Sequence, residues 1–186
     1  MAQTAPNTEF QIKSVDLELQ DTPSLSGGYQ KRGSNKPGKW LEVEVTFDWQ
    51  PRDPQVKYLD AVTVNYFVLL DNKSRENPQG TLLSGTVEHV DVAPGRGLKS
   101  VMFVAPRALD RLFEGRVPGT AKQTVAGVGI TISAEGQEVA QYTTAGKGTW
   151  WSQLEQVGDR LLTKVQTPFA HLAWDYHEPV KPPGSK

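Results

Sequence analysis

The stretch LEVEVTFDW, residues 41–49, decides the fold class of this 186-residue chain. Every second residue is apolar, and Glu42, Glu44, Thr46 and Asp48 stand between the apolar ones. Because successive side chains of a strand point to opposite faces, this period of two predicts a β-strand with one face in a core. A strand covered on both faces would be apolar throughout, so the alternation favours an antiparallel sheet with one solvated face.

Similar alternation recurs along most of the chain and predicts six further strands. One of them contains a phase slip at Lys13 and Ser14, which is typical of a β-bulge, where one extra residue shifts the pairing. Another carries apolar residues on both sides near Phe67 and Leu69, which indicates a central strand. The segments that we expect to form these strands are 9–20, 58–72, 81–92, 98–105, 124–134 and 137–144.

The last two of these segments form a predicted hairpin. Glu135 and Gly136 separate them, and a two-residue connection of this kind is typical of a tight turn between antiparallel strands. Gly127 and Gly129 alternate with apolar residues in the first of the two strands. Glycine has no side chain to pack, so we expect another segment to approach the backbone closely at these two positions.

Two short helices interrupt the strand pattern. Pro106 suits the first turn of a helix, and Gly115 suits the left-handed residue that follows its last turn. Ser152 stands three residues before Glu155, which is the spacing of a capping box, and Gly158 would end that second helix. The whole pattern predicts an all-β protein, an immunoglobulin-like two-sheet antiparallel β-sandwich of about seven strands with one or two short helices and an extended C-terminal segment.

The expected organisation is one domain with short appended segments, because a chain of this length suits a single core. Residues 1–8 are expected to be a flexible N-terminus, and residues 9–149 the sandwich. Residues 150–178 are expected to form a short helix and an aromatic C-terminal segment packed on the sandwich. Residues 179–186 complete the chain as a flexible tail.

The composition excludes several classes of function. Lys and Arg number 20 and Asp and Glu 21, so a net charge of -1 gives no global field that would gather nucleic acid. No apolar run approaches the roughly 18 residues that a membrane-spanning helix needs. The chain has no cysteine, which excludes disulfides, thiolate catalysis and cysteine-bearing metal sites.

Histidine and carboxylate patterns give no reaction centre. His171, Asp175 and His177 project to one side of an extended segment, but four residues of strand separate the first two by roughly 13 Å, too far for one ion. Glu42 and Glu44 share the polar face of one strand, where we expect solvation rather than a catalytic acid and nucleophile. No G-x-S-x-G motif is present. We therefore expect no enzymatic activity, no metal and no cofactor.

Aromatic residues near the C-terminus are the candidates for contact with a partner or a glycan. Flat rings on the edge of a sandwich can stack on sugars or on partner side chains. Trp150 and Trp151 are adjacent, and Trp174 and Tyr176 stand further along. The alternative for the first two is structural, with one ring packed before the Ser152 cap and the other covering an end of the core.

The aromatic and proline-rich tail TPFAHLAWDYHEPVKPP, residues 167–183, needs a reason to be ordered. Fixing a segment costs about 1–2 kcal/mol of backbone entropy per residue, and burial of Phe169, Leu172 and Trp174 would offset that cost. Its alternation of apolar and polar residues is consistent with three placements. The tail forms a final edge strand, crosses the sandwich as a strap, or docks into another subunit by strand addition.

Several stretches together resemble one protein family. The C-terminal run LLTKVQTPFAHLAWDYHEPVK is similar to a TPFA…WDYxEP ending of exported verrucomicrobial proteins. The body resembles the Akkermansia pilus-like protein family, whose gene lies in a cluster with type IV pilus-type components. The stretches that carry this resemblance are KWLEVEVTFDW, YLDAVTVNYFVLLDN, GTVEHVDVAPGRGLKSVMFVAPRALDRLF and GKGTWW. The resemblance covers residues 8–182.

The resemblance implies an immunoglobulin-like sandwich, export and no known catalytic activity, and it transfers no binding residues. The expected location is the periplasm, the outer membrane or the cell surface of a Gram-negative-type bacterium. The start AQTAP after Met1 is also typical of what remains after a signal peptide is removed. An apolar assembly helix of the classical pilin kind is missing from the N-terminal residues, so an accessory or adhesive role is as consistent as a fibre subunit.

These observations together predict a non-enzymatic protein of the cell envelope or a pilus, acting in assembly or in adhesion to a host surface. Its expected partners are proteins of a pilus-type assembly or of a host surface, and not nucleic acid. The alternative is a carbohydrate-binding module for mucin glycans that uses exposed tryptophans.

Overall fold

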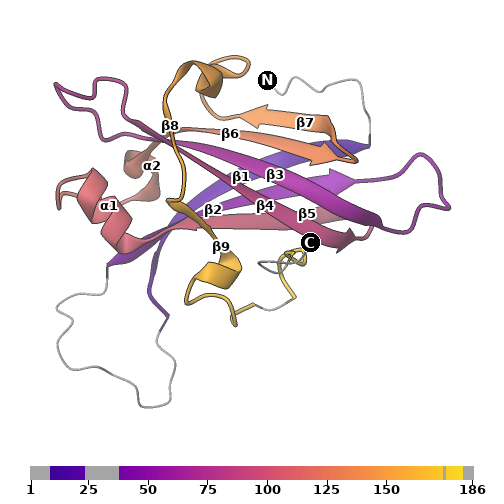
Figure 1. The fold of residues 1–186 in the computed structure, drawn as a ribbon. Coiled ribbons are helices and arrows are strands. Elements are labelled where there is room, and N and C mark those ends of the chain that lie inside the picture. Colours follow the sequence, from indigo (N-terminus) through magenta and orange to yellow (C-terminus); the bar gives the residue numbers. More distant parts are fainter. Residues whose placement is uncertain (1–8, 24–37, 174, 182–186) are drawn as a thin grey trace, which may run out of the picture.

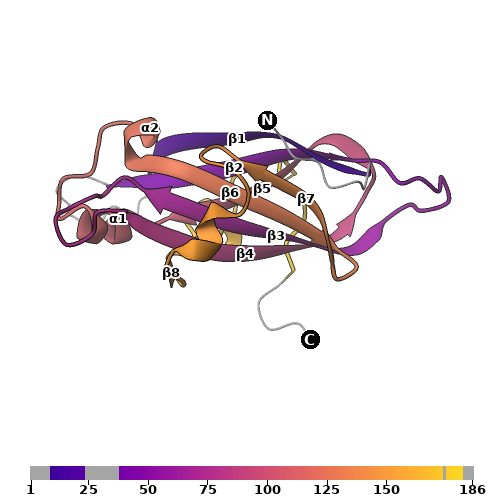
Figure 2. The ribbon, with the colours of Figure 1, turned by 90° about the horizontal axis from the view of Figure 1, so that it is seen from above.

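The computed structural model describes residues 9–23, 38–173 and 175–181. Their strands form two sheets that face each other across one core (Figures 1 and 2). The strands are β1 (Phe10–Asp21), β2 (Lys39–Trp49), β3 (Leu59–Leu70), β4 (Thr81–Val92), β5 (Gly95–Val104), β6 (Val125–Ala134), β7 (Gln137–Thr143), β8 (Gln156–Val157) and β9 (Leu161–Thr163). Sheet A has the order β1-β2-β5-β9, and sheet B has the order β7-β6-β3-β4-β8. The predicted all-β sandwich is confirmed.

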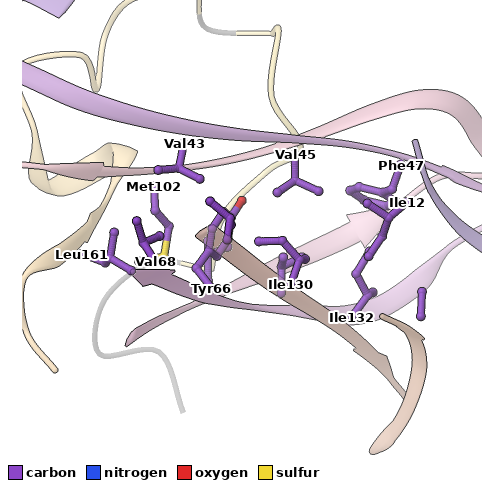
Figure 3. Close-up of a cluster of buried hydrophobic side chains, with 14 of the residues drawn as sticks. Ile12, Val43, Val45, Phe47, Tyr66, Val68, Met102, Ile130, Ile132 and Leu161 are labelled. Carbon is purple, nitrogen blue, oxygen red and sulfur yellow. The ribbon is translucent and has the colours of Figure 1, made fainter. Parts of the chain in front are cut away.

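The alternation of β2 places its apolar side chains in the core between the sheets. Those side chains face inward-pointing residues of β3 and β6, which include Tyr66 and Ile130 (Figure 3). The core-facing residues of β2 are each at most 1% exposed: Leu41, Val43, Val45, Phe47 and Trp49. The predicted bulge in β1 is also present, as a shift of its pairing with β2 between Ile12 and Ser14.

The connections follow the local signals for turns and caps. Glu135 and Gly136 both have positive φ, of 52° and 76°, as the tight β6–β7 turn requires. Helix α1 (Pro106–Leu112) begins with proline as predicted, and Gly115 after it is left-handed with φ 76°. A second short helix, α2 (Ala121–Thr124), carries no strong sequence signal beyond Thr120, whose side chain accepts a hydrogen bond from the backbone of Gln123.

The helix predicted from Ser152 to Gly158 is wrong. The chain forms only the short 3-10 helix η1 (Trp150–Gln153), which ends before Glu155 can act as a capping partner. Ser152 lies inside this helix and donates its hydroxyl to the carbonyl of Thr149 at 2.7 Å. Packing of the Trp151 ring overrides the local capping signal, because that ring is held against sheet B.

Two glycines of β6 leave room for the tryptophan pair to pack closely on the outer face of sheet B. A Cβ atom at Gly129 would overlap the indole ring of Trp151, and one at Gly127 would lie 3.5 Å from the ring of Trp150. Trp151 also stacks on Phe67 of β3, with ring centroids 5.0 Å apart and planes 10° from parallel. The expected close approach of another segment at these glycines is confirmed.

Substituting Gly129→Ala is expected to destabilise the fold by about 1–3 kcal/mol, because the new methyl group forces the Trp151 ring out of its position. Gly119→Ala is the matched control, since a Cβ atom there meets nothing within 4 Å. Urea denaturation monitored by tryptophan fluorescence measures both free energies of unfolding. Equal stabilities for the two variants would contradict the packing role of Gly129.

Candidate functional site

The C-terminal strap, which we define as residues 156–181, closes the side of the sandwich between β4 and β5 (Figure 1). Its first part adds β8 to the edge of β4, with Leu83 opposite Val157. The chain then crosses to the other sheet and adds β9 to the edge of β5, with Phe103 opposite Leu162. One segment therefore pairs with the edge strands of both sheets.

The far end of the strap repeats this double attachment. The backbone N–H of Glu178 donates to the carbonyl of Lys99 in β5 at 2.9 Å. The carbonyl of Pro179 accepts from Val90 in β4 at 3.0 Å, and Val180 forms an isolated bridge with His89. Edge strands leave unpaired backbone groups, and the strap satisfies some of them on both β4 and β5.

Between these attachments the strap forms the short 3-10 helix η2 (Lys164–Gln166) and then, in its described residues, a series of turns. Of the placements expected for the tail, the final edge strand is not formed by these described residues. Phe169 is buried and stacks on Phe103 of β5, with centroids 4.8 Å apart and planes 6° from parallel. It also meets Trp40 edge-on at 5.7 Å. These rings and Val101 form a second apolar cluster on the outer face of sheet A. Phe169 is therefore the apolar anchor of the strap, whereas Leu172 is 38% exposed.

Glu44 of β2 is the polar anchor of the strap. One carboxylate oxygen lies 3.1 Å from Nε2 of His177, and the other accepts a hydrogen bond from Lys99. The hydroxyl of Tyr176 also donates to Glu44 at 3.4 Å. Lys99 in turn lies 4.9 Å from the centre of the Tyr176 ring, a distance suitable for a cation–π contact. Two consecutive strap residues are thus held by one carboxylate and its lysine partner.

The expectation that Glu42 and Glu44 are both solvated is wrong for Glu44, which the strap leaves only 8% exposed. Burial by itself would raise the pKa of Glu44, but hydrogen bonds from His177 and Lys99 outweigh it and lower the pKa. The alternation of residues 41–49 places Glu44 on the outer face of the sheet. It does not reveal that a segment more than 100 residues later in the printed sequence covers that face.

Glu42 lies beside this cluster, where the attraction of Lys164 and Lys99 is too weak to offset its burial. Burial, followed by repulsion from Glu44 and from Glu18, raises the pKa of Glu42 to about 7. The folded state therefore favours the protonated carboxyl more than the unfolded chain does. The stability contributed by Glu42 is present below its ordinary pKa of 4.5 and is lost as the pH rises through about 7.

Glu42→Gln and Glu44→Gln are expected to have opposite effects at pH 8. The first removes a charge that the folded state disfavours, so it raises the melting temperature. The second weakens the contacts with His177 and Lys99 and costs about 1–3 kcal/mol. Thermal unfolding at pH 8 and pH 5 measures both, and the gain from Glu42→Gln should shrink at pH 5. A loss of stability in both variants at pH 8 would refute this account.

A chain of buried hydrogen bonds links the core to the strap. The hydroxyl of Tyr66 in β3 donates to Ser100 Oγ in β5 at 2.7 Å. Ser100 Oγ lies 2.7 Å from Nε2 of His89 in β4. Nδ1 of His89 lies 3.1 Å from the carbonyl of Glu178 and 3.2 Å from that of Pro179.

With a neutral His89 ring, the strap carbonyls fix the direction of every hydrogen bond in this chain. A carbonyl only accepts, so Nδ1 of His89 carries the proton and Nε2 accepts from Ser100. Ser100 then accepts from Tyr66, and each polar atom has a partner. Burial lowers the pKa of His89 to about 4, which is consistent with a neutral ring.

The Ser100 and His89 pair resembles the nucleophile and base of a hydrolase in its short distance alone. Ser100 is 0% and His89 1% exposed, so the hydroxyl faces the core of the sandwich. The hydroxyl also accepts a hydrogen bond from Tyr66, which is itself fully buried. The arrangement joins the two sheets to the strap.

Ser100→Ala is expected to destabilise the protein more than Tyr66→Phe does. The alanine leaves the Tyr66 hydroxyl and Nε2 of His89 without a partner, at about 1–3 kcal/mol for each buried group. Tyr66→Phe removes only the first donor of the hydrogen-bond chain. The contact between Ser100 and His89 stays in place, so a loss of about 1 kcal/mol is expected. Chemical denaturation at pH 7.5 compares the two. A larger loss in Tyr66→Phe would contradict this hydrogen-bond order.

The sequence-predicted contact residues lie in two places. Trp151 is 4% exposed, and Trp150 is half-buried with its indole N–H donating to Thr143 at 2.8 Å. Tyr176 is 51% exposed on the strap. Trp174 lies outside the described residues. Within the described part of the chain, no group of three or more metal-ligating side chains comes together.

Sequence patterns did not single out His89 and Ser100. A signal for them exists, because each is a polar residue at a core-facing position of an alternating strand, in TLLSGTVEHVDV and LKSVMFVA respectively. Such residues need buried partners. The partner of His89 could not be predicted, since it belongs to the backbone of the strap.

Comparisons with known proteins agree with the sandwich. A family model of pilus-like proteins matches residues 1–183. A crystal structure of a protein from Akkermansia muciniphila is similar, with a TM-score of 0.77 and 22% sequence identity over 98% of this chain and 99% of that chain. At this identity the likeness shows the fold alone. None of the curated proteins matches the sequence. Among the described residues, no helix has the length and apolar character to span a membrane.

Proposed function

The chain belongs to the pilus-like protein family of Akkermansia and related Verrucomicrobia, and we propose that it is a non-enzymatic, exported protein of the cell envelope. It acts in the assembly of a pilus-type structure or in adhesion to a host surface. The match of the family model over residues 1–183 is the observation that carries this proposal. The sandwich supports it, since its central polar groups are buried and bonded to one another.

The outer surface of the strap is the contact surface that we propose for a protein partner. Exposed large apolar side chains can mark surfaces at which a partner binds. Four of the six such side chains in the described part of the chain belong to the strap. They are Val157, Val165, Leu172 and Tyr176.

Glycan binding through the tryptophan pair is the weaker alternative. Stacking on a sugar needs an open aromatic face. The ring of Trp151 packs on Phe67 and over Gly129, and its residue is almost fully buried. Only the half-buried Trp150 and the exposed Tyr176 offer ring surface among the described candidates.

The proposed envelope location of the protein is tested by fractionating cells that carry the gene. An antibody detects the protein in each fraction. We expect it in the envelope or in sheared surface fibres, with a periplasmic and a cytoplasmic marker followed in parallel. Recovery with the cytoplasmic marker alone would refute the proposed export.

The contact surface is tested with a photo-crosslinking amino acid in the full chain. We expect protein adducts from position 176 in intact cells, because Tyr176 lies on the proposed surface. Position 58 is the matched control, since Tyr58 is 63% exposed and lies outside the strap. Mass spectrometry identifies the adducts. Adducts from position 58 and none from position 176 would place the contact surface elsewhere.

A further inference from the structure

Two of the three histidines in the chain hold the end of the strap to the sandwich. His89 binds it from inside through the carbonyls of Glu178 and Pro179. His177 binds it from outside through Glu44. The third, His171, is exposed.

We propose that residues 176–181 form a latch that opens on mild acidification, with protonation of His89 as the trigger. The proposal does not depend on the proposed function, because it concerns only how the strap is attached. It predicts local release of the latch while the two sheets stay folded.

The hydrogen-bond chain admits only a neutral His89. Nε2 has to accept from Ser100, and a second proton on the ring would turn that acceptor into a donor. Ser100 would then receive two donors, from His89 and Tyr66, and its own hydrogen would lose its acceptor. The charge would also be buried without a carboxylate bonded to the ring, which is costly.

Opening the latch lets a protonated His89 avoid both costs, the surplus donor at Ser100 and the buried charge. The latch covers the side of His89 that faces away from the core, since its carbonyls take the Nδ1 proton. Once Glu178 and Pro179 move away, water can solvate the imidazolium. The protonated ring therefore favours the open state, and the neutral ring favours the closed state.

Other charged groups near the latch act in different directions. Burial raises the pKa of Glu178, so acid strengthens its place in the folded state. His177 lies between the carboxylate of Glu44 at Nε2 and the ammonium of Lys164, 3.3 Å from Nδ1. Lys164 and Asp175 line the same cavity as His89. On the outer face, Lys99 pairs with Glu44, and Lys181 pairs with Glu88 at 3.0 Å. Tyr66 and Ser100 face His89 from the core without charge. The trigger is assigned to His89 because both of its ring nitrogens have buried partners, and a second ring proton would disturb the bond to Ser100.

The size of the effect follows from the two pKa values of His89. The value is about 4 in the closed state and near the ordinary 6.5 once the ring is solvated. The closed state is fully favoured above pH 6.5, and this preference is lost as the pH falls towards about 4. Between pH 7.5 and pH 5, the opening equilibrium attributable to His89 shifts by roughly 30-fold.

Opening would uncover surface that is otherwise paired. The carbonyls of Lys99 in β5 and Glu88 in β4 would lose the strap N–H groups of Glu178 and Lys181. The N–H of Val90 would lose its acceptor as well. The edges of both sheets would become available at this end of the sandwich.

Hydrogen exchange of the full chain between pH 7.5 and pH 5 tests the latch, with each rate corrected for its intrinsic pH dependence. The reporters are the amides of Val90, Glu178 and Lys181, whose bonds break on opening. We expect their protection to fall by roughly 30-fold more in the natural chain than in His89→Gln. Amides in the paired centre of β3 and β6 should keep their protection.

His171→Gln is the matched control, because this exposed histidine should leave the pH response unchanged. The double variant His171→Gln/His177→Gln leaves His89 as the sole histidine and provides the test if His89→Gln does not fold. It must keep the pH response. The proposal is overturned if the reporter amides show no pH response, if His89→Gln responds like the natural chain, or if β3 and β6 lose protection together with the latch.

Discussion

The hydrogen-bond chain from Tyr66 through Ser100 and His89 to the strap is the interaction on which the rest of the structure depends. It joins β3 in sheet B to β5 in sheet A and returns to β4, so three strands and the strap share one set of donors and acceptors. A buried polar group without a partner costs free energy, and Nδ1 of His89 has its partners only while the strap is in place. The sandwich and its last residues are therefore one structure, because the core includes a histidine that the strap completes.

The same strap determines the character of the outer face of sheet A. It buries Phe169 against Phe103 and places His177 on Glu44. The strap thus converts the polar side of β2 into a partly covered surface, and it presents exposed apolar side chains of its own, such as Tyr176, to the outside. The contact surface that we propose for a protein partner is therefore on the strap.

Most of the fold could be predicted from the sequence, because strands with one buried face repeat their pattern every two residues. The alternation of residues 41–49, the bulge after Ile12 and the turn at Gly136 all depend on neighbours in the chain, and each is present. The helix predicted from Ser152 failed because a tertiary contact, the packing of Trp151 on sheet B, outweighs a local cap.

The candidate site was less predictable than the strands. Its residues come from β2, β3, β4, β5 and the strap, and no local pattern records which of these meet. The sequence does point to an aromatic tail that needs burial to be ordered, and Phe169 supplies it. The pairing of that tail with Glu44 and His89 depends on the sheet order, which the pattern of strands leaves open.

The nitrogen-15 chemical shifts of the His89 ring test this account most directly. At pH 7.5 the account predicts a neutral ring with the proton on Nδ1 and an unprotonated Nε2, because only this tautomer satisfies both Ser100 and the strap carbonyls. Nuclear magnetic resonance of the labelled chain distinguishes the two tautomers and the charged ring. A proton on Nε2, or an imidazolium at this pH, would contradict the claim that the strap completes the core.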